Sequence, residues 1–263
     1  MQPPSSAISS VTPRLRWIAR LAWLTFLLVF LITSLSAWLR LSGRLPGCEP
    51  WPGCLEADAA VGAARALHRM AASASLLVII AMVLLSSLPR PALRVQRASA
   101  LALLGLALFL AVLGALTGRS QAGAVVLGNL LGGMLMLGLA VQLAGSARRQ
   151  EAGPPAAWTG LAIGLTLIQM ALGGLAGMTD ETLSMMHALH ILLALLLIPV
   201  LVVGAWRLVR GRRRASAVLI LSLTVLQIAL GSVIVIDGPT IMIVTMHNMT
   251  AGGLLAVLFH CRT

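Results

Sequence analysis

Histidines inside apolar runs are the residues of this chain whose type and spacing could do chemistry. The stretch 181–193 reads ETLSMMHALHILL and carries His187 and His190, and two further apolar runs carry His68 and His247. Counted from the expected starts of their helices, His68 and His190 lie about eight residues in and His247 about seven, a depth of about 10–12 Å at about 1.5 Å per residue. An ionisable residue inside a membrane segment is a functional candidate, so three histidines at one depth require a common explanation.

Two imidazoles on two helices favour a heme over the other sites that histidines form. Zinc usually needs three or four nitrogen, sulfur or oxygen ligands, and these helices supply no nearby Cys, Asp or Glu. A proton relay would usually include a buried carboxylate, and no span has one in its middle. A heme is planar and apolar, and one axial histidine from each side can hold it. The alternative for any single histidine is an interhelical hydrogen bond, worth about 0.6 kcal/mol.

Small and cationic residues near these histidines fit the same interpretation. Gly252 and Gly253 follow His247, and Gly173 and Gly174 end another apolar segment, so a flat ligand would have room between helices. Arginines near the same membrane face would pair with anionic heme propionates. They are Arg40, Arg65, Arg69 and Arg119. Each of these arginines could equally snorkel to the membrane interface.

The elements that must position these residues are transmembrane helices. The 263 residues are 59% hydrophobic and 10% charged, against about 45–50% and about 25% in soluble proteins. A spanning helix needs about 20 mostly apolar residues, and only helices or closed barrels satisfy their backbone in lipid. The apolar runs lack the alternation of barrel strands, so we expect an all-α membrane protein. Eight spans are predicted, at 17–40, 61–87, 97–117, 122–144, 157–178, 183–206, 215–236 and 240–260.

The arginines set the expected orientation in the membrane. One side, with the N-terminus, three loops and the C-terminus, carries 14 of the 19 basic residues, and the other side carries five. Cytoplasmic loops have an excess of basic residues, so both termini are predicted to be cytoplasmic, in a bacterial-type inner membrane. The histidine sites then lie towards the external face. The net charge of +12 does not indicate nucleic acid, because the arginines punctuate apolar spans.

The chain divides into two halves that resemble each other. ALHRMAASASLLV at 66–78 parallels ALHILLALLLIPV at 188–200, and LTLIQMALGG at 165–174 parallels LTVLQIALGS at 223–232. Internal repeats of membrane proteins often place functional sites at related positions, so we predict two pseudo-symmetric four-helix bundles. The expected parts are a cytoplasmic tail at 1–16, an N-terminal half at 17–146, a cytoplasmic linker at 147–156 and a C-terminal half at 157–263.

The cysteines fall on both sides of the membrane. Cys48 and Cys54 stand close together in the first external loop, and Cys261 stands at the cytoplasmic end. A close pair on the oxidising side can form a disulfide. The pair would be either a staple of the loop or a redox-active pair, whereas Cys261 is expected to be an ordinary thiol.

In their order and spacing, the motifs of this chain resemble those of heme A synthase, the membrane enzyme of cytochrome oxidase assembly that converts heme O to heme A. The resemblance covers nearly the whole chain, including its eight spans. The segments that carry it are WLRLSGRLPGCEPWPGC at 38–54, LHR at 67–69, VLGALTGRSQAGAVV at 112–126, IQMALGGLAGMTD at 168–180 and LQIALGSVIVIDGP at 226–239.

The resemblance implies a role for each candidate residue. His190 and His247 would ligate a resident heme b, with His187 as a further candidate beside them, and His68 would ligate or orient heme O, the substrate. The C8 methyl of heme O would be oxidised to a formyl group in successive steps, with oxygen from water. The implied partners are a heme O donor enzyme and cytochrome oxidase assembly factors, beside the lipid bilayer, and a homo-oligomer is left open.

The external cysteine pair also has an implied role. In heme A synthases such a pair is linked to redox chemistry, so the resemblance implies that Cys48 and Cys54 form a disulfide that accepts electrons or shapes the loop.

The first half departs from the family pattern at two positions. Arg65 stands where the family has a Glu, three residues before the first histidine, and Asn129, or Gly128 if the motif is shifted by one, stands where it has a second histidine. A guanidinium is not a base, and an amide is a poor iron ligand. Arg65, Arg69 and Asn129 are expected to line the substrate pocket. Two other functions stay open: a heme-binding membrane protein that carries electrons or heme without making heme A, and a transporter whose histidines line a polar path.

Overall fold

The structure, a computed structural model, describes residues 5–43, 58–88, 92–117, 123–148, 157–178 and 185–262. These residues form eight α-helices. The helices are Ser5–Leu41 (α1), Ala59–Ser87 (α2), Arg94–Thr117 (α3), Gly123–Arg148 (α4), Ala157–Ala176 (α5), Met185–Arg210 (α6), Arg214–Asp237 (α7) and Ile241–His260 (α8).

All eight helices are long and apolar enough to cross a membrane, with candidate spans of 20 to 29 residues. This confirms the prediction of an all-α fold with eight spans, and the protein is a multi-pass transmembrane protein. The first helix differs from its prediction, because α1 begins at Ser5, inside the expected tail, although its apolar span begins at Pro13. Extending an existing helix by one residue costs less free energy than nucleating a new helix. The apolar span of α1 can therefore continue as helix into the more polar residues that precede it.

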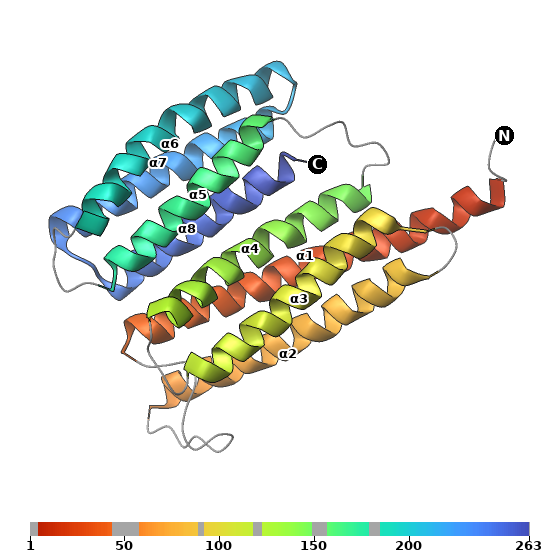
Figure 1. Cartoon of the computed structure of the whole chain (residues 1–263), viewed down its shortest axis with the longest axis horizontal. Coiled ribbons are helices and arrows are strands. Elements are labelled where there is room, and N and C mark those ends of the chain that lie inside the picture. Colours follow the sequence, from red (N-terminus) through yellow and green to blue (C-terminus); the bar gives the residue numbers. More distant parts are fainter. Residues whose placement is uncertain are drawn as a thin grey trace.

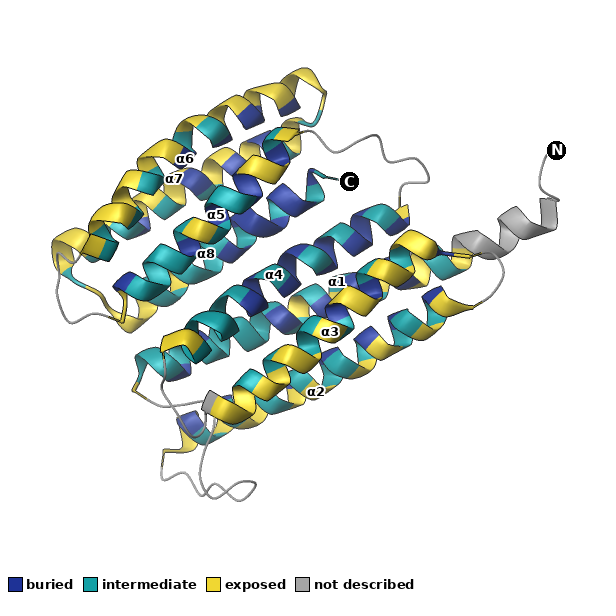
Figure 2. Ribbon diagram, viewed as in Figure 1, coloured by how far each residue is buried: buried dark blue, intermediate teal, exposed yellow. Residues whose placement is uncertain are grey.

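Exposed residues line the outer faces of the helices (Figure 2), and many of them are large and apolar. Leu77, Leu195 and Val235 are 67%, 61% and 69% exposed, which suits contact with lipid rather than water. Two buried threonines inside the spans are satisfied by the backbone of their own helix. The hydroxyls of Thr166 and Thr224 donate to carbonyl oxygens four residues earlier, at 2.7 and 2.8 Å, and such bonds offset the free energy of burying a hydroxyl in an apolar medium.

The helices form two groups of four (Figure 1). In α1–α4 each helix packs on the next and α1 packs on α4, and in α5–α8 each helix packs on the next and α5 packs on α8. Consequently α2 and α4 stand at opposite corners of the first group, and α6 and α8 at opposite corners of the second. Side chains of α6 and α8 that point inward therefore meet across the middle of the second group.

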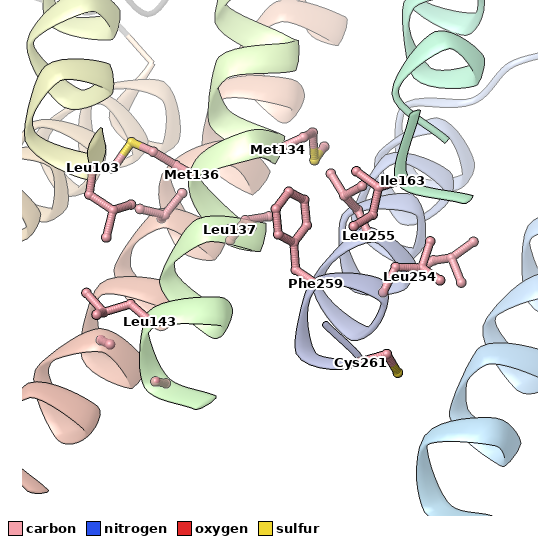
Figure 3. Close-up of a cluster of buried hydrophobic side chains, with 14 of the residues drawn as sticks. Leu103, Met134, Met136, Leu137, Leu143, Ile163, Leu254, Leu255, Phe259 and Cys261 are labelled. Atoms are coloured by element: carbon pink, nitrogen blue, oxygen red, sulfur yellow. The ribbon is translucent and has the colours of Figure 1, made fainter. Parts of the chain in front are cut away.

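The two groups meet mainly along α4 and α8. Glycines permit this close approach: a Cβ at Gly138 would collide with the ring of Phe259, and a Cβ at Gly252 would lie 2.9 Å from the sulfur of Met134. Phe259 is buried against Met134 and Leu137 (Figure 3). Because helices in lipid associate through close packing at small residues, this seam fixes α8 against the first group.

Candidate functional site

His190 and His247 face each other across the second group of helices. His190 lies near the N-terminal end of α6 and His247 near that of α8, and both are half-buried. Their ring centroids are 6.4 Å apart, and the ring planes are inclined by 63°. The two residues that the sequence places at a common depth are therefore brought together, whereas their role as ligands stays a prediction.

A glutamine on the preceding helix holds the backbone of each histidine. The side-chain amide of Gln169 on α5 donates to the carbonyl oxygen of His190 at 2.9 Å, and that of Gln227 on α7 donates to the carbonyl oxygen of His247 at 2.6 Å. The Gln227 amide also bonds the hydroxyl of Thr250, which donates to the same carbonyl oxygen of His247 at 3.0 Å. The hairpins α5–α6 and α7–α8 thus repeat one arrangement within the second group.

A glycine four residues after each glutamine leaves room for the imidazole. A Cβ at Gly173 would lie 2.8 Å from Cε1 of His190, so a side chain there would require the ring to move. A Cβ at Gly231 would lie 3.5 Å from Cε1 of His247, which is ordinary van der Waals contact. Residues i and i+4 of a helix are neighbours on one face, so each Gln-x-x-x-Gly segment presents its amide and its gap to the same histidine.

The two rings differ in their hydrogen bonds. Nδ1 of His190 lies 3.0 Å from the backbone carbonyl oxygen of Gln169, and because a carbonyl only accepts, Nδ1 carries the proton. Nε2 of His190 is then an acceptor, with the side-chain nitrogen of Gln169 at 3.3 Å. Nδ1 of His247, by contrast, is buried and has no hydrogen-bond partner among the described residues. The His190 ring is therefore held at both nitrogens, and the His247 ring is less restrained.

The spacing of the pair fits the two axial positions of a heme. Two metal–imidazole bonds of about 2 Å, with roughly 1 Å from each nitrogen to its ring centre, place two axial ring centres about 6 Å apart. The observed separation is 6.4 Å. A buried polar atom without a partner is destabilising, and Nδ1 of His247 has no partner among the described residues. A metal bound at this nitrogen would therefore remove a destabilising feature of the fold.

A zinc site fits less well. Within the part of the chain that the structure describes, no group of three or more His, Cys, Asp or Glu residues could hold a metal ion. Zinc usually takes three or four protein ligands, whereas a heme brings four ring nitrogens of its own and needs only the axial pair. The donor set of this site therefore favours heme iron over a bare ion.

His187 lies one turn before His190 on α6 and is half-buried. Residues three apart on a helix are neighbours, so His187 belongs to the surroundings of the pair. Its part in cofactor binding stays a prediction.

The predicted residues of the first half lie on two helices at opposite corners. Arg65, His68 and Arg69 are half-buried in the first part of α2, and Asn129 is half-buried in the first part of α4. This corresponds to the placement of His190 on α6 and His247 on α8. The substrate pocket assigned to these four residues stays a prediction.

The third helix carries the same helix-ending motif as α5 and α7, but without the glutamine. Four residues before Gly114 stands Leu110, and its side chain packs on α4, where a Cβ at Gly132 would lie 2.6 Å from Cδ2 of Leu110. A Cβ at Gly114 would have no atom within 4 Å. The helix α3 therefore does not repeat the pairing of a glutamine with a glycine four residues later, which in α5 and α7 faces a histidine of the next helix.

Sequence reasoning missed the two glutamines. The echo between LTLIQMALGG and LTVLQIALGS is visible in the sequence, and Gly173 stands out as a small residue, but neither feature by itself assigns a role to Gln169 or Gln227. The signal that could have found them is the shared Gln-x-x-x-Gly spacing, taken together with a histidine in the next helix.

Three predicted residues, Cys48, Cys54 and Arg119, lie outside the described residues. The disulfide between the two cysteines and the role of this arginine at the heme propionates therefore stay predictions.

The thiol of Cys261, at the end of α8, is expected to react slowly with maleimides. The residue is buried, and burial raises the pKa of its thiol above the ordinary range, against the opposing effects of Arg213 and a hydrogen bond with Ser216. Since the thiolate is the reactive form, a Cys48→Ser, Cys54→Ser protein should label slowly at neutral pH and faster as the pH rises above about 8.5. Rapid labelling at neutral pH would contradict a buried, protonated thiol.

Comparison with known proteins identifies no family for this chain. No protein-family model matches the chain, and no curated protein matches it.

Proposed function

We propose that this protein is a membrane oxidoreductase of the heme A synthase type, which oxidises the C8 methyl of heme O to a formyl group for cytochrome oxidase assembly. The observation that carries the proposal is the opposed pair of His190 and His247, with ring centroids 6.4 Å apart. The motifs that resemble those of heme A synthase, in the same order along nearly the whole chain, support the same function.

In the proposed second-half site, His190 and His247 hold the iron of a heme b. When bound, this group supplies one-electron transfer. The chain's own residues orient the ligands, since Gln169 and Gln227 hold the backbones of the two histidines and Gly173 leaves space for the ring of His190. Ligation by both histidines would leave no open position on the iron, which would suit electron transfer and leave the substrate to another site.

In the proposed first-half site, His68 ligates or orients heme O, and Arg65, Arg69 and Asn129 line its pocket. Conversion of the methyl group to a formyl group takes one oxygen atom from water and releases four electrons and four protons. The disulfide of Cys48 and Cys54 would accept these electrons, and the histidines of the second half would hold the group that passes them on. Arginine side chains are well suited to bind the propionates of the substrate.

The proposed topology gives both sites a common side of the membrane. We assign α1–α4 and α5–α8 to two pseudo-symmetric four-helix bundles, at 17–146 and 157–263, in a bacterial-type inner membrane with both termini cytoplasmic. The grouping of the helices and the arginine distribution support this topology. It places Cys48 and Cys54 on the external side, where their disulfide would accept two electrons and two protons per oxidation step.

A second function is favoured by the departures of the first half. Arg65 and Asn129 replace the family's Glu and second histidine, and Leu110 occupies the position that a glutamine has in α5 and α7. A protein that holds heme b in its second half without oxidising heme O would carry electrons or heme during oxidase assembly.

Identification of the bound hemes separates the two functions. The full-length protein is expressed in cells that make heme O but lack a heme A synthase, and its extracted hemes are identified by chromatography and mass. Heme A or its alcohol intermediate is expected, and His68→Ala should abolish this product while heme b is retained. Heme b alone, with heme O unchanged, would contradict the oxidoreductase and support the carrier.

A further inference from the structure

We propose that Gln169 is a placeholder for the iron at His190: its side-chain amide donates to Nε2 of His190 until the metal takes that nitrogen. The inference rests on the proposed heme site and adds an order of ligation to it. His247 is the open ligand, and His190 is the protected one. Gln169 is a positioning residue in this scheme, because it acts through the histidine.

The tautomer of His190 identifies the nitrogen that is protected. Nδ1 lies 3.0 Å from the backbone carbonyl oxygen of Gln169 and must donate to it. A neutral imidazole has one donor and one acceptor nitrogen, so Nε2 carries the lone pair that an iron would use. Proteins usually orient a metal-binding histidine through a hydrogen bond donated by the ring nitrogen that does not bind the metal, and here Nδ1 makes that bond.

The amide of Gln169 occupies the position beside this lone pair. Its nitrogen carries two hydrogens, and it lies 2.9 Å from the carbonyl oxygen of His190 and 3.3 Å from Nε2 of the same residue. Both neighbours are acceptors, so a rotated amide would set oxygen against oxygen and lose both contacts. The amide oxygen is buried and has no partner among the described residues, so it makes no bond there that would favour the rotated orientation.

The second hairpin provides an internal comparison. Gln227 occupies the position equivalent to Gln169, but its amide bonds the carbonyl oxygen of His247 and the hydroxyl of Thr250. These two bonds use both hydrogens of the amide away from the imidazole. Nδ1 of the His247 ring has no partner among the described residues. Both glutamines therefore bond a histidine carbonyl oxygen, but only Gln169 also places its amide against a ring nitrogen, that of His190.

The asymmetry determines what an arriving iron must displace. At Nδ1 of His247 no donor from the described residues has to leave, whereas at His190 the contact of Nε2 with Gln169 has to break. We therefore expect the first coordination through His247 and a second one, through His190, that is opposed by about one net hydrogen bond.

The test compares Gln169→Leu with Gln227→Leu in the full-length protein. Leucine removes the donor without adding a thioether that could itself ligate heme iron, and both variants lose one bond to a histidine carbonyl. Apoprotein in detergent is titrated with hemin, and the affinity and the six-coordinate fraction are followed by absorbance. We expect Gln169→Leu to bind hemin about 2- to 10-fold more tightly than the wild type, the size of one net hydrogen bond, and Gln227→Leu to bind no more tightly.

The outcomes distinguish this inference from the function on which it rests. If wild-type protein forms no six-coordinate hemin complex, the proposed heme site fails, and the placeholder role fails with it. If the wild-type complex forms but Gln169→Leu is no tighter, or both variants tighten equally, only the placeholder role is overturned. Gln169→Ala repeats the test if circular dichroism shows that the Leu variant is misfolded. Nitrogen NMR of the wild-type apoprotein must also show His190 protonated at Nδ1, and protonation at Nε2 would overturn the inference without any variant.

Discussion

His190→Ala and His247→Ala are each expected to remove the six-coordinate low-spin heme from the purified protein. The two rings oppose each other at 6.4 Å, and each would supply one of the two axial nitrogens, so neither can replace the other. Loss of a residue that merely supports a metal ligand weakens binding by about 10- to 100-fold, and loss of the ligand itself should weaken it at least as much. The measurements are the heme-to-protein ratio and the reduced-minus-oxidised spectrum.

Two histidines of the same chain serve as controls for these variants. His187→Ala removes an imidazole one turn away on the same helix, and His260→Ala removes one at the opposite end of α8. Both should keep the low-spin spectrum. A low-spin signal that survives both His190→Ala and His247→Ala would show that the ligands lie elsewhere.

Gly173→Ala is expected to displace the ring of His190 and to lower heme affinity by about 10-fold or more, as other changes around metal ligands do. The added Cβ would lie 2.8 Å from Cε1 of this ring and 3.2 Å from Nδ1, so the imidazole must leave the hydrogen bond that sets its tautomer. The measurement is hemin affinity together with the six-coordinate fraction of the bound heme.

Gly231→Ala is the matched control, at the equivalent position of α7. Its Cβ would lie 3.5 Å from Cε1 of His247, so the ring need not move, and we expect hemin affinity within about 2-fold of the wild type. Alanine stabilises a helix interior relative to glycine by about 1 kcal/mol in both variants, so a difference between them cannot come from helix propensity. Equal hemin affinity of the two variants would contradict a specific fit between Gly173 and His190.

The sequence predicts the helices well, because lipid imposes one simple rule on the chain. A span must be about 20 apolar residues long and must satisfy its own backbone, and all eight predicted spans correspond to helices. The beginning of α1 could not be predicted in the same way. The residues before Pro13 are mostly polar, and hydropathy contains no information on how far a helix continues beyond its span.

The common depth of the histidines could also be read from the sequence, but their mutual orientation could not. Counting residues gives a height along the membrane normal, whereas the meeting of His190 and His247 depends on α6 and α8 standing at opposite corners of one group. That arrangement is set by packing contacts such as Phe259 on Gly138 at the α4–α8 seam. These contacts join residues far apart in the chain, and no periodicity within one helix encodes them.

The hydrogen-bond partners within the site could not be predicted from the sequence. Gln169 and Gln227 have the same spacing to a glycine and to a following histidine, yet only Gln169 lies against a ring nitrogen. The difference arises from side-chain rotamers and from Thr250, which engages Gln227. A polar residue in a repeated segment can therefore be recognised as a candidate from the sequence, while its partner is fixed only by the packed structure.

The heme content and the absorption spectrum of the purified wild-type protein test the central claim most directly. If His190 and His247 ligate a heme b, the full-length protein should contain one b-type heme per chain, six-coordinate and low-spin in both the oxidised and the reduced state. If the protein purifies without heme, or with a heme that is high-spin in both states, this ligation is contradicted.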